Sequence, residues 1–423
     1  MRWSSKRMDF HKQERPFPSF VPRFVTALGL LPTTEFTWID SDGRRKIKAV
    51  GVLHVTYWIC CFMFFAVQIS SSIYVAIMAV ARPQSDNPFL KALIEISFAC
   101  EVYRGDLFCM YIILYGKKGV QVVIRQTEAL INRFALTKAE QRRIRAVTFL
   151  LATVTLCVVA SISAASFTRW MLQYAANGMT IVPYFTIPVS VAVPLQLLFT
   201  SIPELLLRLT VVLAVGAGLV LLACLKVTRR KLMEGNFGLE SLKNAHREYY
   251  AIANGLFCIS QQMGELLAFS LLFDLVPICG RVTHFFFAAP PVPDVVRQGL
   301  TSFRNYTFIV SGIGFYIFTM YSPFVMLHRE ACKLHLQLLA EKRKVFDAMA
   351  KKEHHLTELN NFLQAFEEQP LALTLVPGFQ IRENFTLLIA TLLGSYTFIC
   401  YQLLKETSTD RSKEANSKNC TVA

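Results

Sequence analysis

The segment from Asn384 to Leu404 reads NFTLLIATLLGSYTFICYQLL, and the interpretation of the whole chain starts from it. It is long and apolar enough for one helix to cross a bilayer, which takes about 20 residues. At about 100° per residue, its four uncharged polar side chains fall within roughly 40° of one another. They are Asn384, Thr391, Ser395 and Gln402. Such a stripe requires water or a partner helix, so the segment is predicted to line a wet path or to pack in a bundle.

The composition is that of a membrane protein. Of 423 residues, 53% are hydrophobic, 34 are Phe and only 17% are charged, which excludes an ordinary soluble domain. The first fifty residues contain ten Lys or Arg and no short apolar run with a cleavage site, so we expect no removable signal peptide. Most of the eleven cysteines fall in or beside apolar segments, where cysteine serves as a small hydrophobe.

Seven stretches are long enough to span a bilayer. They are residues 47–81, 88–116, 144–173, 191–226, 261–289, 303–327 and 385–405. We therefore expect an all-α membrane protein with seven transmembrane helices. The first six, within residues 47–327, are expected to form a bundle that contains a ligand pocket.

The basic residues predict the orientation. The net charge of +15 could indicate nucleic-acid binding, but Lys and Arg are concentrated in alternate connections. Eight lie in 117–145 and eight in 328–384, against one in 169–190 and three in 281–304. By the positive-inside rule, residues 1–46 are cytoplasmic and the polar tail, 406–423, is extracellular. Of the glycosylation acceptors, Asn305 and Asn419 fall on the predicted outside, whereas Asn384 falls at the inner edge.

The connection 328–384 is too long for a simple loop. From Leu334 to Phe366 it carries apolar residues at helical spacing, with Lys and Glu opposite. We interpret it as a cytoplasmic helical anchor, which packs on the inner ends of the fourth to sixth helices or on other copies and assembles subunits. The alternative is a helix lying flat on acidic lipid. Pro377 and Gly378 predict a turn just before the last helix.

The end of the chain also carries a family pattern. Ser395-Tyr396, five mostly apolar residues and Gln402-Leu403 resemble the Thr-Tyr, five hydrophobics, Gln-Phe signature that ends the last helix of arthropod gustatory receptors. Ser replaces Thr and Leu replaces Phe. The preceding Pro377-Gly378-Phe379-x-Ile381 run is similar to the lead-in of the same family, which belongs to the insect chemoreceptor superfamily of seven-helix ligand-gated channels.

This resemblance implies a taste receptor of the plasma membrane that acts as a tastant-gated cation channel, a homo- or hetero-tetramer of like subunits. The last helix would line the pore, with the rings of polar side chains replacing part of an ion's hydration. By position, Ile399 and Leu403 would close it. Family members of the sugar-sensing branch usually have an acidic residue after the motif Tyr, and Thr397 in its place makes a sugar ligand less expected.

Ionisable residues inside apolar segments are candidates for function, because burying them is costly. Glu204 and Arg208 are spaced to form an ion pair on one helix, whereas Glu95 and Asp274 are not so readily explained, and Asp274 has no basic residue one turn away. With polar and aromatic residues at similar depth, these could line a small-ligand pocket open to the outside, or simply make polar contacts beside an aromatic belt. The candidate ligand-binding residues are Gln68, Glu95, Trp170, Asp274 and Tyr306.

Other classes find little support. The sequence has no catalytic, metal-binding or phosphate-loop motif, so we expect no enzyme activity, metal or cofactor. A G-protein-coupled receptor or another non-conducting seven-helix receptor is the main alternative, but it would have the opposite orientation. A secondary transporter is a third reading, although the seven unequal segments show no internal repeat.

Overall fold

The protein was analysed as a computed structural model, which describes residues 37–39, 45–47, 117–177, 201–287, 317–347, 353–399 and 401–402, with isolated positions between 56 and 66. The first predicted segment, apart from those positions, the second, and most of the sixth therefore lie outside the described residues. The labelled elements are β1 (Thr37–Ile39), β2 (Arg45–Ile47), α4 (Lys117–Phe134), α5 (Lys138–Asn177), α7 (Ile202–Glu234), α8 (Leu239–Phe287), α10 (Tyr321–Asp347), α11 (Glu353–Glu368), β3 (Leu373–Val376) and β4 (Phe379–Ile381).

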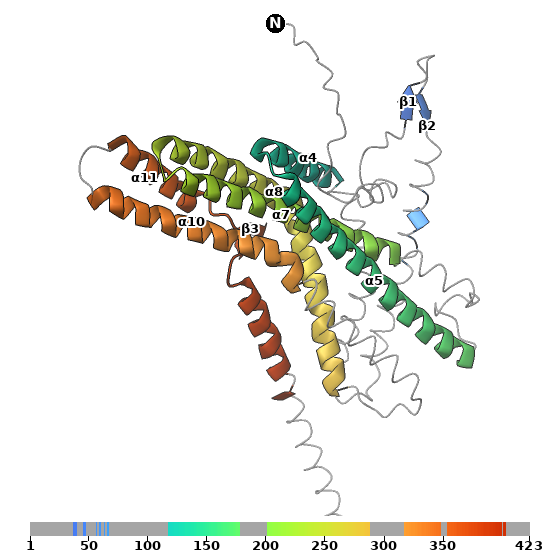
Figure 1. The fold of residues 1–423 in the computed structure, drawn as a ribbon. Helices are drawn as coiled ribbons and strands as arrows, with labels where there is room; N and C mark the ends of the chain where they lie inside the picture. Colours follow the sequence, from blue (N-terminus) through green and yellow to red (C-terminus); the bar gives the residue numbers. More distant parts are fainter. Residues whose placement is uncertain are drawn as a thin grey trace, which may run out of the picture.

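Helix α7 is the centre of the described bundle. It contacts α4, α5, α8 and α10, and Figure 1 shows it running between these helices. From Val211 to Leu225 it is apolar on every side, and nearly all of this stretch is buried. A helix without a polar face is stable only when surrounded, and this explains its central position.

Helices α7 and α8 are longer than the apolar runs that predicted them. The expected segments ended at 226 and resumed at 261, but α7 continues to Glu234 and α8 begins at Leu239. Only the turn 235–238 separates them. The connection between these two segments, residues 226–262, contains six Lys and Arg and is therefore a helical hairpin. Its charged residues have good helix propensity, so they extend both helices beyond the apolar runs.

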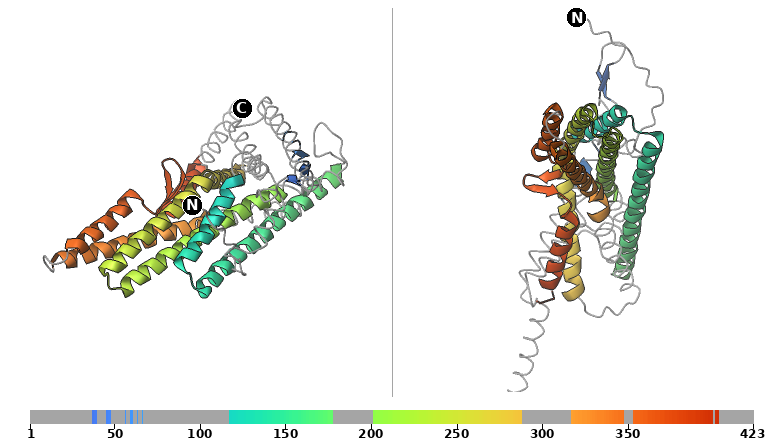
Figure 2. Two further views of the ribbon diagram at one scale, coloured as in Figure 1. Left: turned by 90° about the horizontal axis from the view of Figure 1, so that it is seen from above. Right: turned by 60° about the vertical axis from the view of Figure 1, so that its left-hand side comes forward.

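Helix α5 begins where the sequence carries a capping box, Thr137-Lys138-Ala139-Glu140. The Glu140 amide donates to Thr137 Oγ1 at 3.2 Å, and the Thr137 amide donates to Glu140 Oε2 at 3.0 Å. These reciprocal bonds satisfy two amides that a helix start leaves free. The cap separates α4 from α5, and Figure 2 shows α5 along the edge of the helical layer.

Helix α10 crosses α7 closely at a glycine. A Cβ on Gly218 would lie 3.0 Å from the ring of Phe324, which is itself 1% exposed. The absence of a side chain at Gly218 therefore allows the two helices to pack closely. Residues 317–320 form a π-helical turn that continues directly into α10. The helix therefore runs without a break from the sixth predicted segment into the predicted cytoplasmic region.

The amphipathic region after 328 consists of two helices, α10 and α11, where one periodic stretch was expected. Leu334, Leu338 and Leu359 are fully buried, and Leu363 is 7% exposed. Helix α11 packs on α8 and α10, and Tyr249 of α8 donates a hydrogen bond to the Gln369 carbonyl at 2.8 Å. The apolar face of α11 is therefore covered by the same chain. Its role in assembling subunits stays a prediction.

A β-hairpin joins α11 to the last helix. Strands β3 and β4 pair antiparallel, with Leu373 opposite Ile381 and Val376 opposite Phe379. The turn contains Gly378 with φ of +84°, a backbone conformation that favours glycine. This confirms the predicted Pro377-Gly378 turn, although the two short strands around it were not expected.

The hairpin is docked tightly on α8. A Cβ on Gly264 would lie 2.6 Å from the Thr374 carbonyl oxygen, and the Thr374 amide donates to Ser260 Oγ at 3.2 Å. This contact fixes the start of the final segment, residues Phe385–Ile399 with a helical continuation at 401–402, which we call the last helix. Figure 1 shows it projecting below β3, next to the lower half of α8.

Three described helical stretches are long and apolar enough to cross a membrane: Lys138–Ala160, Ile202–Glu234 and Leu239–Gly280. They coincide with the third, fourth and fifth predicted segments. The described part of the last helix is apolar but shorter. The fold is therefore mainly helical, as expected for a membrane protein, and the full count of seven and the orientation stay predictions.

Candidate functional site

Only one face of the last helix packs against the rest of the described chain. Phe385 is 3% exposed and Ile389 is 2% exposed, and Leu393 packs partly buried against the same core. These residues recur every four positions, so they mark the side that faces the rest of the subunit.

The polar stripe lies on the other side. At about 100° per residue, its mean direction is about 140° from that of the packed face. All four stripe residues are exposed, and they are Asn384, Thr391, Ser395 and Gln402. Thr397, which lies nearer the packed face, is half-buried, and its hydroxyl donates to the Leu393 carbonyl at 2.8 Å. The stripe therefore points away from the subunit to which it belongs.

The exposed side also carries large apolar residues. Leu388 is 50% exposed, Leu392 is 47% exposed and Ile399 is 53% exposed. Gly394 has no atom within 4 Å of the position where a Cβ would stand. An apolar helix that is exposed to this extent needs lipid or other subunits against it. Leu403, the second expected gate residue, lies outside the described residues.

The base of the last helix is fixed by aromatic packing. The ring centroids of Tyr321 on α10 and Phe385 are 5.2 Å apart, and those of Phe379 and Phe385 are 6.4 Å apart. Tyr321 is only 4% exposed, and its hydroxyl donates to the Leu267 carbonyl of α8 at 2.8 Å. A displacement of α8 relative to α10 would therefore also move the first turn of the last helix.

A buried ion cluster joins α7 to α8. The Arg208 guanidinium donates to both carboxylate oxygens of Asp274, at 2.7 and 2.6 Å, and through Nε to Glu204 at 2.7 Å. The Arg208 and Asp274 side chains are 3% and 4% exposed. The cluster therefore holds α7 to α8. The contacts of Tyr321 with Leu267 and Phe385 join α8 and α10 to the last helix.

The predicted ion pair of Glu204 and Arg208 is confirmed. Asp274 has no basic residue one turn away on its own helix, but Arg208 reaches it from another helix, 66 residues away in the sequence. Spacing along one helix detects the first contact but not the second. The bidentate geometry and burial of the second contact identify it as the main structural interaction of Asp274.

The other predicted ligand-binding residues are only partly within the described chain. Trp170 lies in α5, and Asp274 lies in α8. Gln68, Glu95 and Tyr306 lie outside the described residues, as do the glycosylation acceptors Asn305 and Asn419. The outer ligand pocket therefore stays a prediction.

Comparison with known proteins gives structural similarity only. No family model matches the sequence, and no curated protein matches it. The structure of the insect olfactory receptor OR5 from Machilis hrabei in complex with eugenol is similar to this chain with a TM-score of 0.59 and 11% identity. The match covers 91% of this chain and 98% of that receptor.

A second structure of OR5 from Machilis hrabei is also similar, with a TM-score of 0.51 and 13% identity over 91% of this chain. The similarity spans nearly the whole length of both proteins, so it concerns the complete architecture rather than one helical pair. The resemblance to the insect chemoreceptor superfamily, first indicated by the end of the last helix, is therefore confirmed at the level of the fold: this chain has the fold of an insect olfactory receptor.

Proposed function

We propose that this protein is a gustatory-type chemoreceptor of the plasma membrane, a tetrameric cation channel that an external tastant opens. In this proposal the chain crosses the membrane seven times, with its N-terminus in the cytoplasm and its C-terminus outside. The observation that carries it is the last helix: its polar stripe is exposed on the side opposite its own bundle. Four such helices around an axis would place rings of neutral dipoles along a conducting path.

Exposed apolar residues on α10 support assembly into an oligomer. On α10, Leu336 is 65% exposed and Phe346 is 73% exposed, although the same helix buries Leu334 and Leu338 on its other side. Exposed apolar residues in a predicted cytoplasmic region favour contact with like subunits.

The similar olfactory receptor has eugenol bound, which supports a small organic molecule as ligand.

The described contacts also suggest how gating would reach the pore. A ligand shifts a channel toward opening only if it binds the open state more tightly. In this proposal, binding in the outer bundle moves α7 and α8, whose relative position is fixed by Arg208 and Asp274. Tyr321 contacts α8 through Leu267 and packs on Phe385, so it would transmit that movement to the last helix.

Currents test the pore assignment directly. The chain is expressed alone in oocytes and exposed to sugars, bitter compounds and amino acids under voltage clamp. We expect Gln402→Ala to change the relative permeability of cations, because it removes one ring of dipoles. Ile399→Ala should raise the resting current, because a smaller ring excludes water less well. Unchanged currents in both variants, at normal surface expression, would contradict the assignment.

Terminal tags separate this proposal from a G-protein-coupled receptor. On intact cells, an antibody should reach a C-terminal tag and fail to reach an N-terminal one. The reverse result would favour the rival class, and uptake of substrate without current would favour a transporter.

A further inference from the structure

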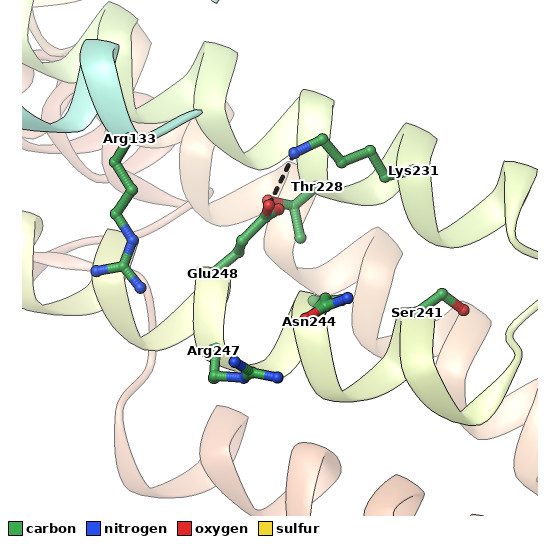
Figure 3. Close-up of a pocket in the computed structure, with 8 residues that line it drawn as sticks. Arg133, Thr228, Lys231, Ser241, Asn244, Arg247 and Glu248 are labelled. Atoms are coloured by element: carbon green, nitrogen blue, oxygen red, sulfur yellow. Dashed lines mark hydrogen bonds and ion pairs between the residues drawn. The ribbon is translucent and has the colours of Figure 1, made fainter. Parts of the chain in front are cut away.

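A pocket of about 330 Å³ lies where α4, the end of α7 and the beginning of α8 meet. Its lining includes three basic side chains, Arg133, Lys231 and Arg247, and one acidic one, Glu248. Figure 3 shows these residues coming from the three helices. None of the predicted ligand residues lines this pocket, and the pore proposal makes no use of it.

The acidic residue of the pocket is already neutralised. Lys231 Nζ lies 2.8 Å from Glu248 Oε1, and the Thr228 hydroxyl donates to Glu248 Oε2 at 2.6 Å. Figure 3 marks the Lys231–Glu248 pair. Within the part of the chain that the structure describes, Arg133 and Arg247 make no ion pair or hydrogen bond. The lining therefore presents two guanidinium groups with no internal counter-charge.

The neighbouring arginines of α7 differ in this respect. Arg229 pairs with Glu330 at 2.8 Å, and Arg230 pairs with Glu140 at 3.2 Å. Arg229 and Arg230 thus have carboxylate partners on other helices, whereas Arg133 and Arg247 in the pocket lining have none among the described residues. Around them, Ser241 and Asn244 add a hydroxyl and an amide to the lining.

We propose that this pocket binds a phosphate-bearing anion. Guanidinium groups bind phosphate through two parallel, charge-assisted hydrogen bonds, and two of them suit a group with more than one phosphate. The pocket lies in connections that the distribution of Lys and Arg predicts to be cytoplasmic. The anion is therefore an inositol-type polyphosphate, either free in the cytosol or as the headgroup of a membrane lipid.

Binding of two probes to the purified full-length chain tests the site. The soluble probe is fluorescent inositol hexakisphosphate, titrated against the protein in detergent. The lipid probe is phosphatidylinositol 4,5-bisphosphate in nanodiscs, compared with nanodiscs of equal negative charge made with phosphatidylserine. We expect Arg133→Gln with Arg247→Gln to weaken binding of at least one probe about tenfold or more.

The control removes the same charge elsewhere on the same helices. Arg125 on α4 and Lys243 on α8 are exposed and do not line the pocket. The variant Arg125→Gln with Lys243→Gln should bind within about twofold of the unmodified chain. Loss confined to the soluble probe identifies a free polyphosphate, and loss confined to the lipid probe identifies a headgroup.

Equal loss in both double variants would overturn the proposal, because the attraction would then be that of general positive charge. No binding of either probe above the phosphatidylserine control would overturn it as well. Both assays measure binding without current, so their failure is distinct from a failure of the channel proposal. Thermal unfolding of both double variants checks that each remains folded.

Discussion

At the scale of single residues, the sequence predicts contacts within one helix but not contacts between helices. Glu204 and Arg208 are four residues apart, so their ion pair follows from helix geometry. Asp274 carries no local signal for its partner, because the position of Arg208 depends on how α7 and α8 cross. The ligand role of Asp274 stays a prediction, and the fold adds to it the contact with Arg208, which the sequence did not indicate.

We expect Asp274→Asn to destabilise the bundle by about 3 to 5 kcal/mol, because it leaves the buried Arg208 with one carboxylate fewer. The measurement is thermal unfolding in detergent. A joint change, Arg208→Met with Asp274→Leu, should recover most of the loss, since it removes both charges together. Glu248→Gln serves as the control: Lys231 is half-exposed, so this loss should stay near 1 kcal/mol. If Asp274→Asn were no more harmful than the control, the cluster would not hold α7 to α8.

His328 on α10 lies near Leu371, Arg382 and Glu383, in the region before the last helix, and it makes the stability of the fold depend on pH. Burial lowers the pKa of His328; the Leu371 carbonyl and Glu383 oppose this shift, and Arg382 adds to it. The folded state therefore binds the proton less tightly than the unfolded state. The contribution of His328 to stability is present above the ordinary pKa of 6.5 and is lost as the pH falls below it.

Unfolding temperatures measured between about pH 8 and pH 5 should show this loss. His328→Gln should flatten the dependence over that interval, because glutamine does not titrate. His354, which is exposed on α11, provides the matched control, and His354→Gln should keep the original slope. An identical slope in both variants would assign the effect to other groups.

At the scale of elements, hydrophobic runs locate the membrane segments well and their ends poorly. The third, fourth and fifth predicted segments correspond to α5, α7 and α8. The hairpin between α7 and α8 was missed because its last and first turns are charged, and a hydropathy pattern does not distinguish a charged helix from a loop. The β3–β4 hairpin was missed because its strands are too short to show alternation.

The docking of that hairpin on α8 can be tested with two glycines. Gly264→Ala should cost about 1 to 3 kcal/mol, because its methyl group would press against the Thr374 and Leu375 carbonyl oxygens. We expect thermal unfolding at a lower temperature and weaker agonist-evoked current. Gly394→Ala, in the last helix, meets no atom within 4 Å, and should leave the stability of the subunit unchanged or slightly higher. Equal behaviour of the two variants would argue against tight docking.

At the scale of the whole molecule, the sequence of the last helix is the part of the chain that best predicts the class of fold. Its polar stripe and terminal motif indicated the insect chemoreceptor superfamily, and the similarity to OR5 over 91% of the chain agrees at the level of the fold. Residues of a pocket come together only through the packing of several helices, so the candidate ligand pocket, three of whose five residues lie outside the described part of the chain, stays a prediction. The same packing produces the basic pocket beside α4, for which the sequence offers only a general excess of Lys and Arg.

The central claim is that the exposed stripe of the last helix lines the ion path, and cysteine accessibility tests it most directly. Thr391 is exposed on the stripe, whereas Thr397, on the same helix, is half-buried and bonded to the Leu393 carbonyl. Each is replaced by Cys, and a charged, water-soluble thiol reagent is applied to the open channel. The account predicts that the reagent changes the current of Thr391→Cys and leaves that of Thr397→Cys unaffected. Modification of Thr397→Cys alone, or of both at equal rates, would contradict it.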